Sequence, residues 1–316
     1  MSAIQPDAPK ADAPQADAPL RIAVVIPHLN QPAMLARCLA ALGAGHEAPD
    51  EVVVVDNGSH ELPEAICAAA GARLVPEAAP GPGPARNRGV AATTAEILAF
   101  IDADCLADPG WIAAIRAAFA DPSAEILGGD VRIARADPAR ITMLEAYESI
   151  YAYRMDRYIA EQGFTGTGNL AVRRRVLEAV GPFGGLDVAE DRDWGQRATR
   201  AGHDLRYVPA MRVHHPARRS FAELAQKWDR HIAHDFAAAR NRPGGRLRFA
   251  LKAAAMALSP LAEAPRVALS DRVSGGQARA LAWAGLWRIR LYRMRAMARL
   301  LLSDDPQALS GRWNRG

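Results

Sequence analysis

Three short runs of apolar residues constrain the fold of this chain more than any other feature of its sequence. Each contains β-branched residues and ends abruptly at a proline or an aspartate. Such runs are typical of strands buried on both faces of a parallel sheet. Because helical patterns separate them, the sequence predicts an α/β domain whose sheet is mainly parallel. The runs occupy residues 22–26, 51–55 and 97–101, and a further short strand is expected over 72–75.

Polar side chains follow each of the three runs directly. The segment 27–30 follows the first run, Asp56 and Asn57 follow the second, and Asp102-Ala-Asp104 follows the third. The carboxyl ends of parallel strands meet at one edge of a sheet, where ligands bind in folds of this class. The sequence therefore predicts a functional site at that edge.

The rest of the chain predicts further elements and a helical C-terminal part. Asn30 is expected to cap the first helix, which Pro32 enters. Residues 1–20 repeat Asp-Ala-Pro and predict a disordered tail. From residue 220 onward the pattern is helical, with breaks at Pro243, Pro260, Pro265 and Gly275. Helices are predicted over 32–42, 65–70, 85–92, 109–119, 139–161 and 187–201, and strands over 125–134, 205–208 and 211–213, with a strand and then a helix over 171–180.

The charge of the chain is divided unevenly. The net charge of +4 invites a nucleic-acid function, but residues 1–240 carry 25 Lys and Arg against 31 Asp and Glu. Residues 241–316 carry 14 against 4, so the basic charge belongs to the C-terminal quarter. An acidic main domain argues against nucleic-acid binding. The three cysteines lack metal-ligand spacing, and the sequence has neither a signal-peptide pattern nor a long apolar segment, so we expect a cytoplasmic protein.

The Asp-x-Asp triplet after the third run is the clearest candidate for chemistry. Asp102 and Asp104 follow a buried strand at a tight turn, and carboxylates so placed suit Mg²⁺ or Mn²⁺. Aspartates are also common turn residues, so the triplet alone leaves a structural role open.

Six short segments in a fixed order carry a stronger signal. Together they resemble the family 2 glycosyltransferases, which are inverting nucleotide-sugar enzymes of the GT-A fold, and the resemblance extends over residues 21–215. It implies an α/β, Rossmann-like mixed sheet with helices on both faces, followed here by a helical C-terminal extension. The segments are VVIPHLN (24–30), VVVDNGS (53–59), GPARNRG (83–89), FIDAD (100–104), GTGN (166–169) and AEDRDW (189–194).

The resemblance implies three parts for the chain, namely the tail (1–20), a catalytic domain (21–219) and a basic helical extension (220–316). Within the catalytic domain, residues 21–104 would bind the donor and 105–219 the acceptor. The donor would be a nucleotide-diphosphate sugar, with a UDP-sugar favoured. Asp56 would bond the base, although a turn role before Gly58 is an equal alternative. The donor-binding residues implied are Pro27, Asn30, Asp56, Asn57, Arg86 and Asp102.

The resemblance also implies the metal and acceptor residues. Asp104 and Asp102 would hold Mn²⁺ or Mg²⁺, with His215 as a further ligand for which His214 competes, and a plain turn before Pro216 is an alternative. Asp191 would be the base that inverting transfer needs, although acidic residues also favour the first turn of a helix. The residues implied for the acceptor or sugar are Gly168, Asn169, Glu190 and Trp194, the last of which could equally be a core residue.

The basic extension predicts contact with a membrane surface. On a helix, residues 281–302 place Trp283, Leu286 and other apolar residues on one face with arginines beside it, which suits an anionic membrane interface. Packing of this helix on the catalytic domain is the alternative, and Arg290 interrupts the apolar face. The predicted face comprises Trp283, Leu286, Trp287, Leu291, Met294, Met297, Ala298 and Leu301.

These observations predict a metal-dependent, inverting glycosyltransferase. It would transfer a single sugar to a hydroxyl acceptor, because the Gln-x-x-Arg-Trp pattern of processive members is absent after Gln196. The acceptor would be a saccharide or lipid-linked molecule in cell-surface polysaccharide or glycolipid synthesis, at the cytoplasmic face of the inner membrane. A nucleotidyltransferase and a non-catalytic membrane adaptor are the alternatives.

Overall fold

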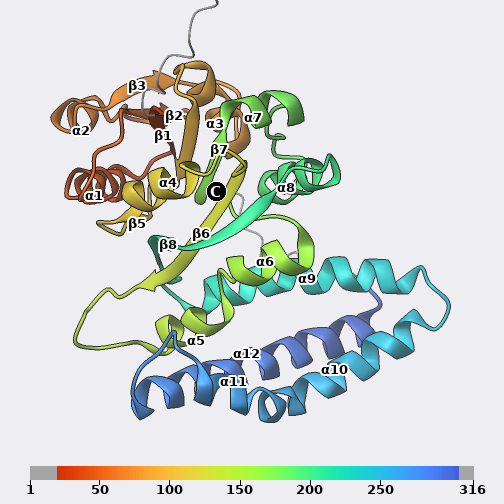
Figure 1. Cartoon of the computed structure of the whole chain (residues 1–316). Helices are drawn as coiled ribbons and strands as arrows, with labels where there is room; N and C mark the ends of the chain where they lie inside the picture. Colours follow the sequence, from red (N-terminus) through yellow and green to blue (C-terminus); the bar gives the residue numbers. More distant parts are fainter. Residues whose placement is uncertain (1–19, 306–316) are drawn as a thin grey trace, which may run out of the picture.

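A computed structural model describes residues 20–305 of the chain. The predicted N-terminal tail, Leu20 excepted, lies outside the described residues. An α/β domain forms one part of the molecule and a group of long helices forms the other (Figure 1). Within the described part, no helix is both long enough and apolar enough to span a membrane.

One eight-stranded sheet organises the α/β domain, in the order β3-β2-β1-β4-β7-β6-β8-β5. The three apolar runs are confirmed as strands β1, β2 and β4, which lie side by side and parallel. β7 is antiparallel to both of its neighbours, so the sheet is mixed. The strands are β1 (Ile22–His28), β2 (Glu51–Asp56), β3 (Arg73–Pro76), β4 (Ile97–Ile101), β5 (Leu106–Ala107), β6 (Ile126–Ala134), β7 (Asn169–Arg173) and β8 (Leu205–Pro216).

Helices cover both faces of this sheet, as expected. Alternate residues of β1 enter two separate cores, because successive side chains of a strand point to opposite faces. Ile22 and Val24 pack with α1 and α4, whereas Ala23 and Val25 pack with residues of α3, α7 and α8. The helices of this domain are α1 (Pro32–Gly43), α2 (Glu64–Ala69), α3 (Pro82–Ala91), α4 (Trp111–Phe119), α5 (Met143–Tyr151), α6 (Met155–Gln162), α7 (Arg174–Val180) and α8 (Glu190–Arg200).

Several predicted boundaries were wrong. The helix expected over 139–161 is two helices, α5 and α6, separated by a turn in which Tyr153 has a φ of +49°. The two short strands expected after residue 204 are one strand, β8, which pairs with β6 along its length except at an irregularity beside Gly129 and Asp130. Gln31, and not Asn30, occupies the N-cap position of α1, without a capping hydrogen bond from its side chain, and Asn30 lies one residue earlier in a left-handed conformation.

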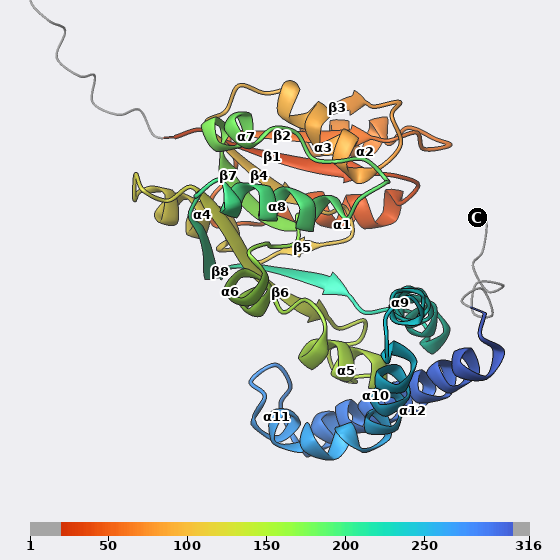
Figure 2. The ribbon, with the colours of Figure 1, turned by 90° about the vertical axis from the view of Figure 1, so that its right-hand side faces the viewer.

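The extension consists of α9 (Phe221–Arg240), α10 (Gly245–Ala262), α11 (Ala264–Leu269) and α12 (Gly276–Ser303). Pro260 lies in the last turn of α10 and does not end that helix. α12 packs along α5, α9 and α10 (Figures 1 and 2). The backbones of α12 and α5 approach closely at Gly285, where a Cβ atom would lie 2.8 Å from the Cβ of Tyr147.

Of the apolar face predicted for α12, two residues are buried, two are exposed (Trp283 and Ala298) and the other four are half-buried. Leu286 and Met297 are buried in contacts with the neighbouring helices, which was the alternative that the sequence left open. Most of the exposed large apolar side chains of the extension lie on α10 and α11, where Leu247, Leu251, Leu258, Leu261 and Leu269 are each more than half exposed, and α12 adds Trp283 and Leu302.

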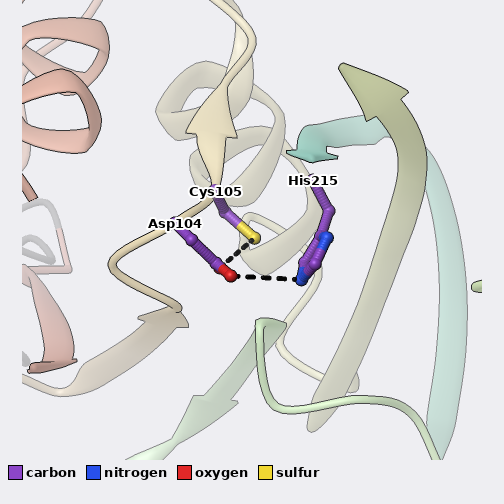
Figure 3. Close-up of side chains that lie close together, drawn as sticks. All are labelled: Asp104, Cys105 and His215. Atoms are coloured by element: carbon purple, nitrogen blue, oxygen red, sulfur yellow. Dashed lines mark hydrogen bonds and ion pairs between the residues drawn. The ribbon is translucent and has the colours of Figure 1, made fainter. Parts of the chain in front are cut away.

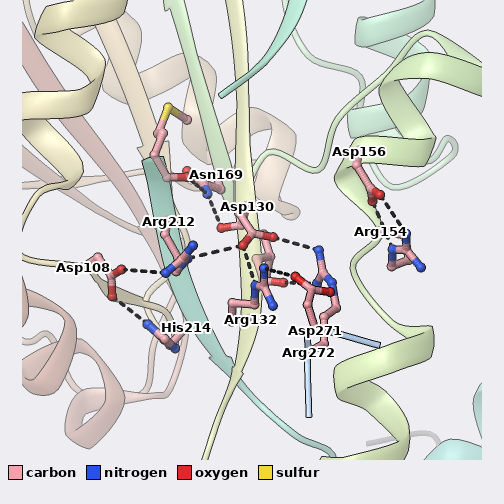
Figure 4. Close-up of polar contacts among 12 residues, drawn as sticks. Asp108, Asp130, Arg132, Arg154, Asp156, Asn169, Arg212, His214, Asp271 and Arg272 are labelled. Atoms are coloured by element: carbon pink, nitrogen blue, oxygen red, sulfur yellow. Dashed lines mark hydrogen bonds and ion pairs between the residues drawn. The ribbon is translucent and has the colours of Figure 1, made fainter. Parts of the chain in front are cut away.

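A buried cluster of charges joins the extension to the sheet (Figure 4). Asp130 of β6 is 1% exposed and accepts hydrogen bonds from Arg132, Arg212 and Arg272. Arg272 precedes α12 and also donates to the Val131 carbonyl. The extension is therefore tied to the central sheet by a buried ion pair as well as by apolar packing.

Candidate active site

The polar segments that follow β1, β2 and β4 lie together at one edge of the sheet, as the sequence predicted. The His28 ring, at the end of β1, lies 2.9 Å from the Asp56 carboxylate at the end of β2. Asp102 and Asp104 follow β4, the neighbour of β1 on its other side. Parallel pairing of β1 with both strands is what brings these residues to one edge.

Asp104 and His215 form the candidate metal centre (Figure 3). The His215 Nε2 lies 3.4 Å from the Asp104 Oδ2, and the Cys105 thiol lies 3.7 Å from the other carboxylate oxygen. His214 points elsewhere and lies 2.6 Å from the Asp108 carboxylate. Of the two adjacent histidines, His215 is therefore the one placed beside the Asp-x-Asp segment.

The donor atoms of this centre fit a hard divalent ion. A carboxylate and an imidazole are ligands that Mn²⁺ accepts. Burial raises the pKa of Asp104, with repulsion from Asp102 adding to it and attraction to His215 opposing it. Burial, together with the nearby Asp102 and Asp104, also raises the pKa of Cys105 well above its ordinary value. Thiolates suit softer ions such as Zn²⁺, whereas carboxylates suit Mn²⁺ and Mg²⁺, so for a hard ion Asp104 and His215 are the candidate ligands, with Cys105 beside them.

Arg86 connects the Asp-x-Asp segment to the acidic start of α8. Its guanidinium is buried and donates to Asp102 at 2.6 Å and to Glu190 at 3.0 Å. Its Nε has no hydrogen-bond partner among the described residues. Arg86 therefore positions two carboxylates of the site, in addition to any contact with a ligand.

Asp191 lies beside this ion-pair network, on the first turn of α8. Burial raises the pKa of its carboxyl, and repulsion from Glu190 and Asp102 adds to the effect, while Arg86 opposes it. A partly desolvated carboxylate with a raised pKa is a stronger base than an exposed one.

Gly168 lets the loop before β7 approach the Asp-x-Asp segment. A Cβ atom at position 168 would lie 2.5 Å from the Asp102 Oδ2. The next residue, Asn169, is fully buried, with its amide donating to the Asp130 and Met211 carbonyls and its oxygen accepting from Trp111. Asn169 thus holds strands together, and because it also lines the cavity that contains Asp191, its contact with a sugar stays a prediction.

Three predicted contacts are corrected. Trp194 is 1% exposed, packs on Phe183 and donates to the Gly181 carbonyl, so it is a core residue and not an acceptor platform. The Asn57 side-chain amide forms hydrogen bonds within the protein: its nitrogen donates to backbone carbonyls of the loop 77–81, and its oxygen accepts from the Gly81 backbone. The turn role that the sequence allowed for Asp56 is the one observed.

The Asp56 carboxylate is buried and accepts hydrogen bonds from His28, Gly58 and Ser59. The His28 Nε2 accepts from the Gln31 backbone, so its Nδ1 is the atom that donates to Asp56. Burial acts to raise the pKa of Asp56, but these hydrogen bonds together lower it. Its oxygens are therefore engaged within the protein.

Two cavities meet at the candidate metal centre. The larger, of about 910 Å³, extends from Asn30 at the start of α1 to Asp104. The smaller, of about 280 Å³, contains Asp191. Both are lined by Tyr153 and His215. The smaller cavity is also lined by Arg86, Asp102, Gly168, Glu190 and Lys227.

Tyr153 and Lys227 were not predicted as site residues. The Tyr153 hydroxyl lies 3.2 Å from the His215 ring, a contact that depends on the unexpected turn between α5 and α6. Lys227 comes from α9, which the sequence assigned to a separate extension. Neither contact has a local sequence signal, because each depends on the packing of elements distant in the chain.

Comparison with known proteins places this arrangement in a family. The model of Glycosyl transferase family 2 matches residues 23–181. The glycosyltransferase AglE of Haloferax volcanii is 32% identical over 215 residues, which cover 65% of this chain and 70% of AglE. The pre-mycofactocin glycosyltransferase of Mycobacterium tuberculosis is 26% identical, and the match spans 62% of this chain and 43% of that protein.

The architecture also has a counterpart among solved structures. The mannosyltransferase PcManGT from Pyrobaculum calidifontis, in complex with GDP-Man and Mn²⁺, aligns over 94% of this chain and 92% of its own with a TM-score of 0.54. At 20% identity this likeness shows the fold alone, which is GT-A. With a family match over half of the chain and the Asp-x-Asp segment at the expected edge, the chain belongs to glycosyltransferase family 2 and is a glycosyltransferase.

Proposed function

We propose that this glycosyltransferase transfers a single sugar from a nucleotide-diphosphate donor to a hydroxyl acceptor, with inversion at the anomeric carbon and with the help of Mn²⁺ or Mg²⁺. The observation that carries the proposal is the position of Asp191. It lines the smaller cavity together with Asp102, while Asp104 and His215 stand where that cavity meets the larger one. The proposed base and the candidate metal centre thus border two adjoining cavities, which share His215 and Tyr153.

Asp104 and His215 would hold the metal, which when bound neutralises charge on the departing diphosphate. The nucleotide, for which we favour UDP, would extend into the larger cavity beside Asn30, with Pro27 nearby in the chain. Asp102, positioned by Arg86, would contact the ribose. Asp56 and Asn57 are left out of the proposed base contacts, because their polar atoms form hydrogen bonds within the protein.

The acceptor would enter the smaller cavity. Its hydroxyl oxygen would attack the anomeric carbon as the bond from that carbon to the diphosphate oxygen breaks, and the hydroxyl proton would pass to Asp191. A single displacement of this kind inverts the anomeric configuration and needs one base. Gly168 and Glu190 border the same cavity and would shape the space for the sugar.

Donor binding and transfer can be separated by experiment. Thermal-shift assays with UDP-, GDP- and dTDP-sugars, with and without Mn²⁺, identify the donor, since ligand binding raises the melting temperature. Asp104→Ala should remove the metal-dependent part of that shift. Asp191→Asn should keep the shift and lower donor turnover at least 100-fold.

Asp187→Asn is the matched control for this experiment, because Asp187 is exposed in the loop before α8 and lines neither cavity. It should behave as the wild type. Undiminished turnover by Asp191→Asn would contradict the assignment of the base.

We also propose that the extension contacts an anionic lipid surface, which would place the enzyme on the cytoplasmic face of a membrane beside a lipid-linked acceptor. Leu247, Leu251, Leu258 and Leu261 follow helical spacing on one side of α10, and Leu269 of α11 is 85% exposed. The segment 241–316 that contains them carries 14 basic and 4 acidic residues. Apolar side chains within a basic segment suit an interfacial helix.

Flotation with vesicles tests this surface. The full chain should float with vesicles that contain phosphatidylserine and less with phosphatidylcholine alone. Replacement of both Leu251 and Leu258 by Glu should abolish flotation, whereas Leu62→Glu, an exposed leucine of the α/β domain, should not. Equal flotation of both variants would contradict this membrane surface.

A further inference from the structure

Lys227 is a cation without a counter-ion at the edge of the active site. It is one of three lysines in a chain of 39 basic residues, and it projects from α9 to line the smaller cavity. Among residues 20–305, no hydrogen bond or ion pair involves its Nζ atom. By contrast Lys252, on α10, forms a surface ion pair with Asp235 at 2.7 Å.

Glu148 attracts Lys227, but no ion pair joins the two in the described part of the chain, because the Glu148 carboxylate is already occupied. Glu148 is 1% exposed, and both of its carboxylate oxygens accept hydrogen bonds from Arg218, one from the backbone and one from the guanidinium. Burial, with repulsion from Arg218 and Arg230, lowers the pKa of the Lys227 ammonium, and attraction to Glu148 offsets only part of this effect. A partly desolvated charge of this kind is costly unless an opposite charge joins it.

The smaller cavity is therefore lined by groups of opposite charge. Asp191 and Glu190 border it from α8, and Lys227 borders it from α9. Tyr153 and Tyr158 contribute aromatic walls. A molecule that places a hydroxyl at Asp191 and a negative group at Lys227 would satisfy both groups at once. Lys227 does not line the larger cavity, in which Asn30 and the proposed donor lie.

We propose that the acceptor of this enzyme carries a phosphate ester, which Lys227 binds while the acceptor hydroxyl faces Asp191. The inference rests on the proposed function and names the acceptor class for the same site. Free phosphate esters and phosphate esters on lipids share this chemistry. The extension thus supplies a specificity residue to the active site, in addition to its structural contacts.

Calorimetric titration of the full chain with glycerol 3-phosphate tests the soluble form of this ligand. UDP and Mn²⁺ are kept at saturation so that the donor site is filled. Lys227→Met should weaken binding about 10- to 100-fold, as expected for the loss of a hydrogen bond to a charged group. Lys227→Arg should restore most of the affinity, and Lys252→Met should bind like the wild type. Circular dichroism checks that each variant is folded.

Vesicles test the lipid form. Binding to vesicles with phosphatidic acid, relative to phosphatidylcholine alone, should fall in Lys227→Met if the phosphate belongs to a lipid and stay the same if it belongs to a soluble molecule. Dependence on Lys227 in either arm supports the proposal. No dependence in both arms, or no binding by the wild type, overturns it.

A third measurement separates the acceptor from the donor. If UDP and Mn²⁺ abolish binding of glycerol 3-phosphate, and Lys227→Met weakens UDP binding tenfold, Lys227 belongs to the donor site and the proposal fails. These binding assays do not need sugar transfer. A wild type that binds the ester at Lys227 but neither binds nor turns over any nucleotide sugar would contradict the proposed function alone.

Discussion

At the scale of single residues, the site depends on close approaches that leave no room for larger side chains. Gly168 is the clearest case, because a Cβ atom there would lie 2.5 Å from an oxygen of Asp102. Asp102 is also held by Arg86, so it has little freedom to withdraw without breaking that ion pair. The position of this carboxylate is thus set jointly by a glycine and an arginine.

We expect Gly168→Ala to displace Asp102 and to lower donor affinity about tenfold or more, with a smaller effect on folding. Gly166→Ala is the matched control, since its new Cβ would meet the flexible end of Met155 at 3.0 Å. Titration with UDP and Mn²⁺ measures the affinity, and thermal unfolding measures stability. Equal affinities for both variants would show that the contact with Asp102 is unimportant.

The raised pKa of Asp191 predicts how turnover falls on the acid side of its pH dependence. A base must be deprotonated, so turnover should fall as the pH drops through a pKa above the ordinary aspartate value of 3.8. Glu190→Gln removes a negative neighbour that contributes to the rise, so it should move this fall to lower pH. The measurement is kcat/KM against pH, and a fall that moves to higher pH would contradict the stated cause.

At the scale of elements, the point at which α5 begins is important for the site. The helix leads into the turn at Tyr153, and its buried side packs against α12. Thr142 caps the helix by accepting from the Glu145 backbone, while the Glu145 side chain accepts from the backbones of Thr142 and Ala136. This capping box therefore fixes both the helix and the loop that leads to it from β6.

Thr142→Ala should lower the free energy of unfolding by about 1 kcal/mol, the usual effect of removing such a cap. Ser149→Ala is the control within the same helix, because the Ser149 hydroxyl only donates to the Glu145 carbonyl, which the helix already uses. Urea denaturation compares the two variants. A larger loss for Ser149→Ala would argue against the role of the cap.

At the scale of the whole molecule, the catalytic domain and the extension share a core. Tyr147 of α5 is buried together with Leu224 of α9 and Leu286 of α12, and Asp130 of β6 binds Arg272. We therefore propose that residues 20–305 unfold as one unit and that the division at 219–220 is functional and not a folding boundary. Lys227 follows from the same packing, since only a docked α9 brings it to the site.

Gly285→Ala should weaken this docking and lower stability by about 1–3 kcal/mol, because a Cβ at 2.8 Å from Tyr147 forces α12 away from α5. Gly276→Ala, at the open start of the same helix, should be neutral or slightly stabilising. Calorimetry should show a single transition in both variants. Two separate transitions in the wild type would contradict a shared core.

The sequence by itself determined the parallel strands and the edge at which they end. Apolar runs such as 22–26 and 97–101 are local signals. Asp102 and Asp104 directly follow the run 97–101, and they lie at the edge of the sheet where that signal places them. The same local pattern located α8 and therefore Asp191. These predictions succeeded because the pattern and the element occupy the same stretch of chain.

The tertiary structure decided which polar residues are free to meet a ligand. The sequence does not show that the polar atoms of Asp56 and Asn169 hydrogen-bond within the protein. Nor does it show that Leu286 and Met297, within the apolar face predicted for α12, are buried by neighbouring helices. Lys227 shows the converse, since it reaches the cavity from a distant helix. Hydrogen bonding and burial between remote segments are properties of the packed chain, so no local pattern contains them.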